Sequence, residues 1–518
     1  ACTSDNKTVV DGQTTVTSNS AGGVAVFTPS DGITLNQQTP LNKWAKLVPD
    51  LAKALADAGF KKGDIDHTTS DSLAKQSRAI QDFVVDHLSN NTTDDSGIAI
   101  APDNMTLLVA PVVEADASTR QYGDYISQNL STNDATDGEA TSDGESSEDD
   151  SSKDDSSNTE SDSTASDEQA QAVDRLVSSL KLAKESGMHV VLLGNSIEGY
   201  KPDAFVKFSD AQTIGKLQAE KMVSKLKLDK ASKDNPKYIE VLLPYTAVDE
   251  KGNANDSTFA QEAFRGIWQV LGSYYQKGVV ESPSGTLDGK STENDWQAVA
   301  YDAAKEGSTA KVLDKRLAKT DGQSTLTRID GIITMNDYIA SEVVKELDDL
   351  GYTGSAADIN PQITISGIVG NITGKKDLSR DAVPDPIKSP ENDNANDSSS
   401  SDDDADEDTS ASDKDRDSQW PLVTGYGAYV SNIPSIVNGK QWMTGMEDRQ
   451  TIATDIAQAC AKLNKDEALN SMPSIRNSEV GGVKKIPTIS EPLLAVSASN
   501  LKSALIDPGY ISLADAGL

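Results

Sequence analysis

A regular alternation of short apolar runs with amphipathic stretches is the feature of this sequence that most constrains its fold. The run 24–27 predicts a strand, and a helix at about 40–58 carries one apolar face formed by Trp44, Leu47, Leu51 and Leu55. The pattern continues with a helix at 72–88, a strand at 107–113, a helix at 172–186 and a strand at 190–193. Strands that alternate with helices favour βαβ units and a parallel sheet.

The second half of the chain repeats this rhythm. We expect helices at 214–226, 260–274, 296–317 and 340–350, and strands at 238–243, 331–335 and 422–424. A further apolar run at 363–368 competes with 422–424 for the place of the last of these strands. Two βα sets of similar size predict an α/β protein with two doubly wound parallel-sheet lobes, in which ligands lie beyond the carboxyl ends of the strands.

Two Ser/Asp-rich stretches interrupt the pattern and carry most of the negative charge. Residues 131–170 hold 14 acids and one base, and residues 391–419 hold 12 acids and two bases. They contribute −13 and −10 of the formal −35, which leaves an ordinary acidic surface of −12 for the remaining chain. Such composition cannot form a packed core, so we predict two disordered acidic inserts. We interpret them as solvated spacers; the alternative is an acidic interaction arm or a cation-binding arm.

The N-terminus indicates a lipid anchor. The chain starts Ala1-Cys2, and a Thr/Ser/Gly-rich tether extends to Gly23. A small residue before a cysteine resembles the end of a bacterial lipoprotein signal, in which that cysteine receives the lipid; the alternative is an incidental cysteine. We therefore expect a leader at 1–21, lipidation of Cys2 and attachment to the outer face of the cell membrane. The second cysteine, Cys460, lies in an apolar helical run and is predicted to be a buried thiol.

Several functional classes have no support in the sequence. There is no basic stripe to neutralise phosphates, so a nucleic-acid partner is disfavoured, and no apolar run reaches 18 residues. The phosphate-binding, dinucleotide-binding, zinc and nucleophile-elbow motifs are absent. The histidines His67, His87 and His189 are scattered. We therefore expect no catalytic residues, no cofactor and no metal, and a binding protein in place of an enzyme.

The closing third resembles a known family. The segments 422–429 (LVTGYGAY) and 433–444 (IPSIVNGKQWMT) resemble a strand, helix and turn of the xylose-binding and multiple-sugar-binding receptors of ABC importers. The segments 108–113, 208–210 and 331–337 resemble their third strand, first crossover and a cleft strand. The terminal segments 486–496 and 500–510 match their C-terminal pattern. Because this downstream spacing matches without a gap, we prefer 422–424 to 363–368 as the cleft strand.

The resemblance implies a type I periplasmic-binding fold. In this fold two α/β lobes are joined by three crossovers and close on a ligand by hinge motion. The N-terminal lobe is then expected at 22–203 plus 440–491, and the C-terminal lobe at 204–439 plus 492–518.

The resemblance also implies a ligand site between the lobes, although several family positions are changed. Gly194 and Asn195 stand where the family places an Asp-Arg pair, and Tyr426 and Gly427 stand where it places Gln-Asp. Tyr426 is a candidate stacking platform; Trp44 is either a second platform or a core residue. The candidate ligand-binding residues are Asp31, Glu114, Asn195, Asp210, Asn255, Asp256, Asn336, Asp337 and Tyr426.

The leading hypothesis is a monomeric solute-binding lipoprotein that delivers a small carbohydrate to an ABC permease. The alternative is a surface sensor or accessory lipoprotein that keeps the fold but binds a different ligand or none. An enzyme on an α/β scaffold is the third hypothesis.

Overall fold

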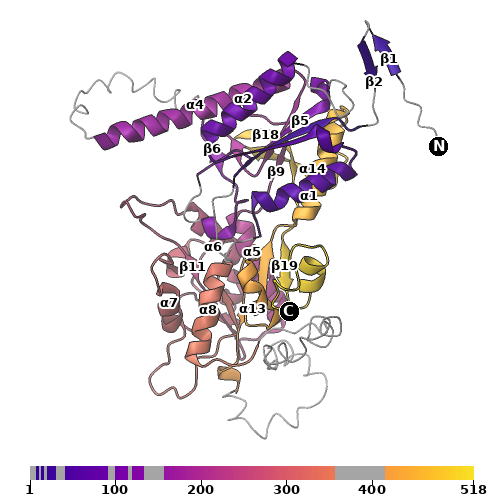
Figure 1. Cartoon of the computed structure of the whole chain (residues 1–518). Helices are drawn as coiled ribbons and strands as arrows, with labels where there is room; N and C mark the ends of the chain where they lie inside the picture. Colours follow the sequence, from indigo (N-terminus) through magenta and orange to yellow (C-terminus); the bar gives the residue numbers. More distant parts are fainter. Residues whose placement is uncertain are drawn as a thin grey trace, which may run out of the picture.

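The structure is a computed structural model that describes residues 7–10, 13–16, 20–30, 41–90, 100–114, 119–132, 157–355 and 415–518. It consists of two α/β lobes stacked end to end (Figure 1). A separate hairpin of β1 (Lys7–Val10) and β2 (Gln13–Val16) precedes the first lobe. Cys2 and most of the predicted leader lie outside the described residues.

The N-terminal lobe is built on a 7-stranded sheet in the order β17-β18-β9-β7-β5-β3-β4. Every neighbouring pair from β18 to β4 is parallel, and β17 closes the far edge as an antiparallel hairpin with β18. The strands are β3 (Gly23–Pro29), β4 (Ile65–Ser70), β5 (Met105–Val109), β7 (His189–Leu193), β9 (Ala204–Val206), β17 (Ile475–Val480) and β18 (Val483–Ile489).

Strand side chains alternate between the two faces of this sheet, and each face buries its own pair of helices. Val26, Leu108 and Val191 pack with α1 (Trp44–Asp57) and α14 (Arg449–Asn464). Their chain neighbours point to the opposite face and pack with α2 (Leu73–Asn90) and α4 (Ser157–Glu185). A sheet covered on both faces requires strands without a polar side, which explains the continuous apolar runs.

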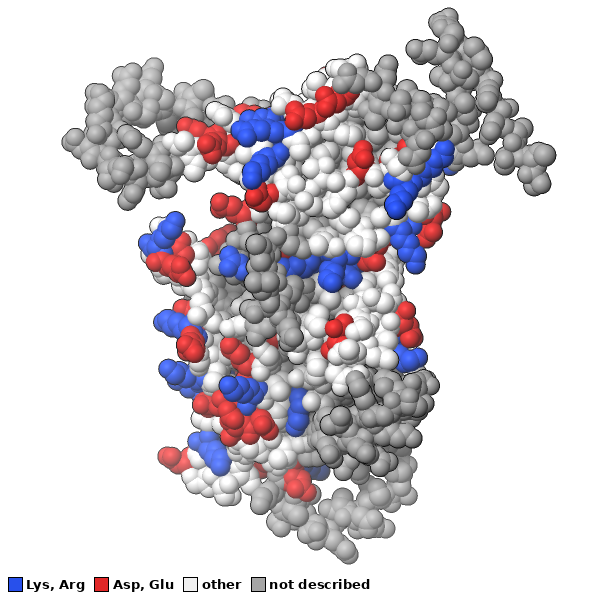
Figure 2. All heavy atoms as spheres, viewed as in Figure 1, with Lys and Arg blue, Asp and Glu red and all other residues white. Residues whose placement is uncertain are grey.

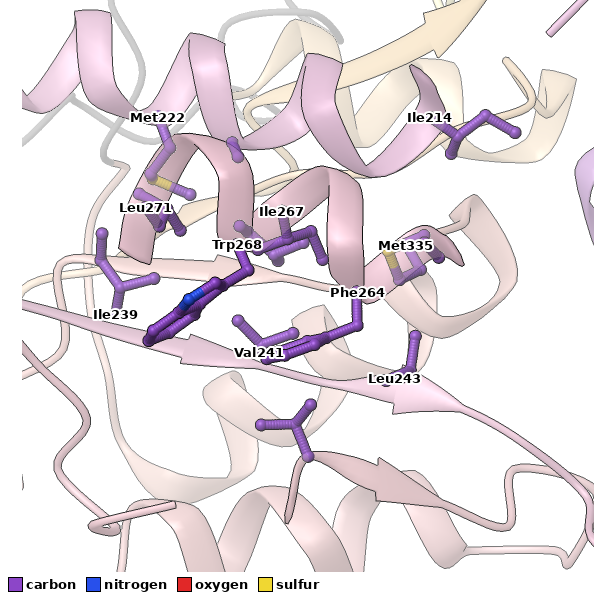
Figure 3. Packing of buried hydrophobic residues seen from close by; sticks show 14 of the residues in the cluster. Ile214, Met222, Ile239, Val241, Leu243, Phe264, Ile267, Trp268, Leu271 and Met335 are labelled. Carbon is purple, nitrogen blue, oxygen red and sulfur yellow. The ribbon is translucent and has the colours of Figure 1, made fainter. Parts of the chain in front are cut away.

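The C-terminal lobe has a 4-stranded parallel sheet in the order β12-β10-β14-β15. The helices α5 (Ala211–Leu226) and α6 (Thr258–Gln276) pack on one face, where Phe264, Ile267 and Leu271 of α6 point toward β10 (Figure 3). The helices α7 (Ser308–Arg316) and α8 (Asp337–Leu350) pack on the other face. The strands are β10 (Lys237–Val241), β12 (Val280–Glu281), β14 (Gly331–Ile333) and β15 (Leu422–Val423).

Two short strand pairs extend the C-terminal lobe. The strand β11 (Leu243–Pro244) pairs with β13 (Ala300–Tyr301), and β16 (Met443–Met446) pairs with β19 (Leu494–Ser497). Shorter elements are β6 (Asn129–Leu130), β8 (Ser196–Ile197), α13 (Ile433–Val437), a π-helical turn (Lys502–Ile506), and 3-10 turns at Lys62–Asp64, Pro102–Asn104, Arg120–Tyr122, Leu228–Lys230, Asp295–Ala298 and Val430–Asn432.

The structure corrects two predicted elements. The predicted helix 296–317 is wrong over its first half, which forms a 3-10 turn and β13; α7 starts only at Ser308, after Gly307 with φ +74°. The helix α4 starts at Ser157, inside the stretch predicted to be disordered through 170, because the apolar face at Ala172–Ala183 packs on the sheet and the helix extends N-terminally from it.

Of the two candidate cleft strands, only 422–424 lies within the described residues. Leu422 pairs with Gly331, so 422–423 forms the strand next to β14 as preferred. Residues 363–368 lie outside the described residues, as do 133–156 of the first insert and 391–414 of the second.

Three segments connect the lobes. Residues 207–210 lead from β9 to α5, residues 447–448 from β16 to α14, and residues 490–493 from β18 to β19. Two doubly wound parallel-sheet lobes joined in this way form a type I periplasmic-binding fold. The first two crossovers lie a few residues C-terminal to the positions expected from the sequence, since β9 belongs to the N-terminal sheet and β16 pairs within the C-terminal lobe.

Candidate ligand-binding site in the interlobe cleft

The carboxyl ends of four N-terminal-lobe strands line a polar cavity of about 240 Å³. Ser30 follows β3, Asp71 follows β4, Val112 follows β5 and Asn195 follows β7. In a parallel sheet these ends lie side by side, which is where such sheets place their ligands. The remaining lining includes Lys43, Trp44, Thr119, Arg120, Asp124, Ile126 and Gln128.

Trp44 lines this cavity and is also anchored in the core. Its side chain is only 3% exposed, and its ring meets those of Tyr125 and Phe208 edge-on, with centroids 4.9 and 5.6 Å away. A Cβ added at Gly194, whose φ is +71°, would lie 3.1 Å from the Trp44 ring. A side chain at 194 would therefore crowd the Trp44 ring and strain the backbone, and both effects disfavour the charged residue that the family resemblance implies there.

The described residues 119–130, here called the cleft segment, run between the two lobes. On the N-terminal-lobe side, Ser127 donates to the Gly194 carbonyl at 2.6 Å, and the Gln128 amide donates to Asn195 Oδ1 at 2.9 Å. Its last residues form β6, which pairs with β8 in parallel. These bonds fix the end of the segment to the strand that leads into the cavity.

The start of the cleft segment reaches the C-terminal lobe. Tyr122 is buried in the core of that lobe, with its ring centroid 4.7 Å from that of Phe259 and 6.2 Å from that of Tyr426. Gln121 accepts hydrogen bonds from Tyr429 Oη to its carbonyl at 2.7 Å and from Asn336 Nδ2 to its side chain at 3.0 Å. The deep part of the junction is therefore filled by the chain itself.

Asn195 is the predicted residue that lines the 240 Å³ cavity, but its amide is already engaged. Its Nδ2 donates to the Pro111 carbonyl at 2.9 Å, and its Oδ1 accepts from Gln128. Asn195 thus positions the walls of the cavity. Glu114 is exposed, lies beside residues 115–118, which are outside the described residues, and does not line the 240 Å³ cavity. Asp31 and Cys2 lie outside the described residues.

Asp337, predicted to contact ligand, is fully buried in a polar network. It accepts hydrogen bonds from the Tyr429 amide, Gln441 Nε2 and Thr444 Oγ1, each at 2.9 Å. Burial raises the pKa of its carboxyl from 3.8 to about 6, against the lowering effect of these donors. Its neighbour Asn336 caps α8 through the Ile339 amide. Both residues hold this end of the lobe together in the described arrangement.

Tyr426 is buried and offers no open ring face. Its hydroxyl lies 2.7 Å from Ser209 Oγ and 3.5 Å from Glu447 Oε1. Its aromatic neighbour is Tyr122 of the cleft segment. At a position predicted to stack on ligand, the neighbouring ring therefore comes from the same protein, at a tilt of 41°.

The other predicted residues lie on separate cavities. Asp210 and Asp256 line a cavity of about 440 Å³. Asp210 caps the N-terminus of α5, and Asp256 accepts a hydrogen bond from Thr258 Oγ1. Asn255 lines a cavity of about 770 Å³ together with Arg120, and it donates to the Thr246 carbonyl at 2.8 Å. Thr119, Arg120 and Ile126 border more than one of these cavities, so the cleft segment divides the junction.

Sequence reasoning missed the charged groups of the first cavity. Asp71 follows a strand with four consecutive exposed positions, 66–69, which lacks the apolar run used to find strands. Arg120 and Asp124 lie in a segment without periodicity. The signal that could have found Asp71 is its place after a helix stop and a short β-branched run.

The sheet orders and the three crossovers define a two-lobed periplasmic-binding fold. No protein-family model and no curated protein matches the chain. Among solved structures it is similar to an ABC transporter solute-binding protein from Clostridium phytofermentans with bound β-D-glucose (16% identity, 95% of this chain and 99% of that chain covered, TM-score 0.44).

A carbohydrate transporter solute-binding protein from Chloroflexus aurantiacus in complex with D-glucose is 18% identical (96% and 98% covered, TM-score 0.44). A periplasmic ribose ABC transporter protein from Conexibacter woesei is 14% identical (94% and 96% covered, TM-score 0.40). The assignment of the fold rests on the sheet orders and crossovers of the chain itself.

Proposed function

We propose that this chain is the solute-binding lipoprotein of an ABC importer and that it carries a small carbohydrate. The observation that supports the proposal best is the polar cavity of about 240 Å³ at the carboxyl ends of β3, β4, β5 and β7. A binding protein of this kind does no chemistry: it holds its solute and is recognised by a permease.

The chemistry of the cavity suits a polyol. Asp71, Arg120 and Asp124 line it together with Trp44. A carboxylate or a guanidinium can hold two adjacent hydroxyls at once, and such charge-assisted hydrogen bonds are the stronger kind. Asp71 forms an exposed ion pair with Lys75 at 3.0 Å, which solvent screens and a ligand hydroxyl can replace. The volume suits a monosaccharide better than an oligosaccharide, since pockets for larger ligands usually span ~300–1,000 Å³.

Titration calorimetry of the full chain against pentoses, hexoses and small oligosaccharides tests this proposal. A monosaccharide should bind, and Asp71→Asn or Arg120→Gln should weaken it by about tenfold or more, because a hydrogen bond to a charged group is worth ~1.5–3 kcal/mol. Asp57→Asn, at an exposed site on α1 away from the cavity, is the matched control. Absence of binding to every sugar in the panel would overturn the proposal that the ligand is a carbohydrate.

The location of the protein is part of the same proposal. We infer that Cys2 carries a lipid that holds the chain at the outer face of the membrane, and that the chain acts as a monomer. No helix among the described residues is long and apolar enough to cross a membrane. Mass spectrometry of the protein extracted from membranes, with Cys2→Ser as control, tests whether Cys2 carries a lipid. Light scattering of the purified chain tests whether it is a monomer.

A second function has support of its own. The deep junction is filled by the cleft segment, and Gly194 and Gly427 carry no side chain that could hold a sugar. These observations favour a surface sensor or accessory lipoprotein with the same fold and another ligand or none. Co-purification with an ABC permease would favour the importer, and its absence together with a negative sugar panel would favour the accessory role.

A further inference from the structure

We propose that the cleft segment is a built-in substitute for ligand, which holds the two lobes closed in the absence of any solute. In hinge-closing binding proteins the ligand contacts both lobes and so favours the closed state. In this protein residues 119–130 provide such contacts. The inference goes beyond the proposed function, since it holds whether or not the solute is a sugar.

Two tyrosines of the cleft segment insert into opposite lobes. Tyr122 is 2% exposed and packs in the C-terminal-lobe core against Phe259. Tyr125 is 1% exposed and packs in the N-terminal-lobe core against Trp44 and Phe208. Large aromatic side chains buried in this way dominate the energetics of interfaces. Separating the lobes would require one of the two rings to leave its core.

The turn between the tyrosines fits only glycine. Gly123 has φ +99°, and a Cβ added there would lie 2.5 Å from Asn42 Cβ and 2.7 Å from the Asn42 carbonyl oxygen. Next to it, the Asp124 amide donates to that same carbonyl at 2.7 Å, and Asp124 Oδ2 accepts from the Trp44 amide at 3.2 Å. The segment is thus locked onto residues 42–44 at the point where it turns from one lobe to the other.

Leu41, which precedes Asn42, also contacts both lobes. Leu41 packs in a C-terminal-lobe cluster with Ile433 and Val496. Its amide donates to the Gly427 carbonyl at 3.0 Å, and its carbonyl accepts from Arg449 Nη1 at 2.6 Å. The lock at Asn42 therefore lies between two contacts with the C-terminal lobe, Leu41 and Tyr122. This arrangement closes the lobes through side chains that no solute has to supply.

Pulsed EPR on the full chain measures the separation of the lobes directly. Nitroxide labels at Lys53→Cys on α1 and Lys311→Cys on α7 occupy exposed sites on different lobes, in a Cys2→Ser background with Cys460 buried. We expect one narrow distance distribution without ligand. Tyr122→Ala and Gly123→Ala should broaden it and shift it by several ångströms to longer distances.

Matched controls separate opening from general damage. Gly322→Ala makes the same change at another positive φ, +83°, but with no atom within 4 Å. Tyr274→Ala removes a tyrosine of the C-terminal lobe that bonds Asp229 and lies outside the cleft segment. Both should give the wild-type distribution. If Tyr122→Ala does not fold, Gln121→Ala with Tyr429→Phe removes the polar ties and leaves the aromatic core intact.

A broad distribution in the wild-type chain without ligand would overturn the proposal. A folded Tyr122→Ala or Gly123→Ala variant with an unchanged distribution would also overturn it. Because no solute is present in these measurements, a failure of the carbohydrate proposal leaves them unaffected.

Discussion

The Glu447 carboxylate accepts a hydrogen bond of 2.5 Å from the Ser209 backbone amide, which joins the second crossover to the first. Glu447 is 1% exposed, and its carboxylate also accepts a hydrogen bond from the Tyr426 hydroxyl. The connection between the lobes thus depends on a buried acid whose charge is poorly solvated. Burial raises its pKa from 4.5 to about 7 in spite of the Ser209 and Tyr426 hydrogen bonds.

The raised pKa of Glu447 predicts a stability that falls as pH rises. Between about 4.5 and about 7 the folded chain holds a proton on Glu447 that the unfolded chain has released, so the free energy of unfolding decreases by up to ~1.4 kcal/mol per pH unit over this window and levels off above it. Glu447→Gln should remove this contribution. Urea unfolding from pH 4 to 8 measures it; equal slopes for both proteins would contradict the prediction.

The close packing around Gly425 leads to a second prediction about stability. A Cβ at this position would lie 2.3 Å from Asp337 Oδ1 and 2.6 Å from Gln441 Nε2, within the buried network. Gly425→Ala should therefore destabilise the chain by about 2–4 kcal/mol, because crowding adds to the loss of hydrogen bonds to a buried carboxyl. Gly289→Ala is the control, since the nearest atom there is 3.6 Å away. The urea midpoint distinguishes the two variants.

The sequence predicts the layers of this fold better than it predicts the site. Leu47, Leu51 and Leu55 recur at helical spacing and are all buried on the sheet, because burial of an amphipathic face produces that spacing. Asp337 shows the physical reason: a carboxylate at the carboxyl end of a strand suits a ligand or a buried network equally well. Only the positions of Gln441, Thr444 and the Tyr429 amide distinguish these outcomes.

The cleft segment could not be predicted, because its tyrosines follow no periodicity. Tyr122 and Tyr125 are three residues apart, a spacing that on a helix would place them on one face. In the structure they point into different lobes, because Gly123 turns the backbone between them at φ +99°. Contacts between segments far apart in the chain, such as Tyr122 with Phe259, leave no local pattern.

The buried ion pair in the C-terminal lobe gives a prediction with a compensating variant. Arg316 Nη1 lies 3.0 Å from Glu240 Oε1, and the two side chains are 7% and 0% exposed. Arg316→Met leaves a buried carboxylate without its cation and should cost about 3–5 kcal/mol of stability. Adding Glu240→Gln should recover a large part of this loss. Thermal unfolding of the single and the double variant measures this recovery. Equal melting temperatures for the two would contradict the role of the unpaired charge.

Substitution of Gly194 tests why this position lacks the charged side chain that the family resemblance implies. A Cβ there would lie 3.1 and 3.3 Å from Trp44 ring atoms, and the backbone has φ +71°. Gly194→Ala should therefore combine two costs: ~1–2 kcal/mol for a side chain at positive φ and a further ~1–3 kcal/mol for crowding the indole. Gly199→Ala isolates the first cost, because Gly199 has φ +73° and no atom within 4 Å. The difference between the two unfolding free energies then measures the contact with Trp44. Adding Trp44→Phe should shrink that difference, since the smaller ring vacates the space. If the two glycine variants are equally stable, the indole does not exclude side chains from this position, and the missing charge needs another explanation.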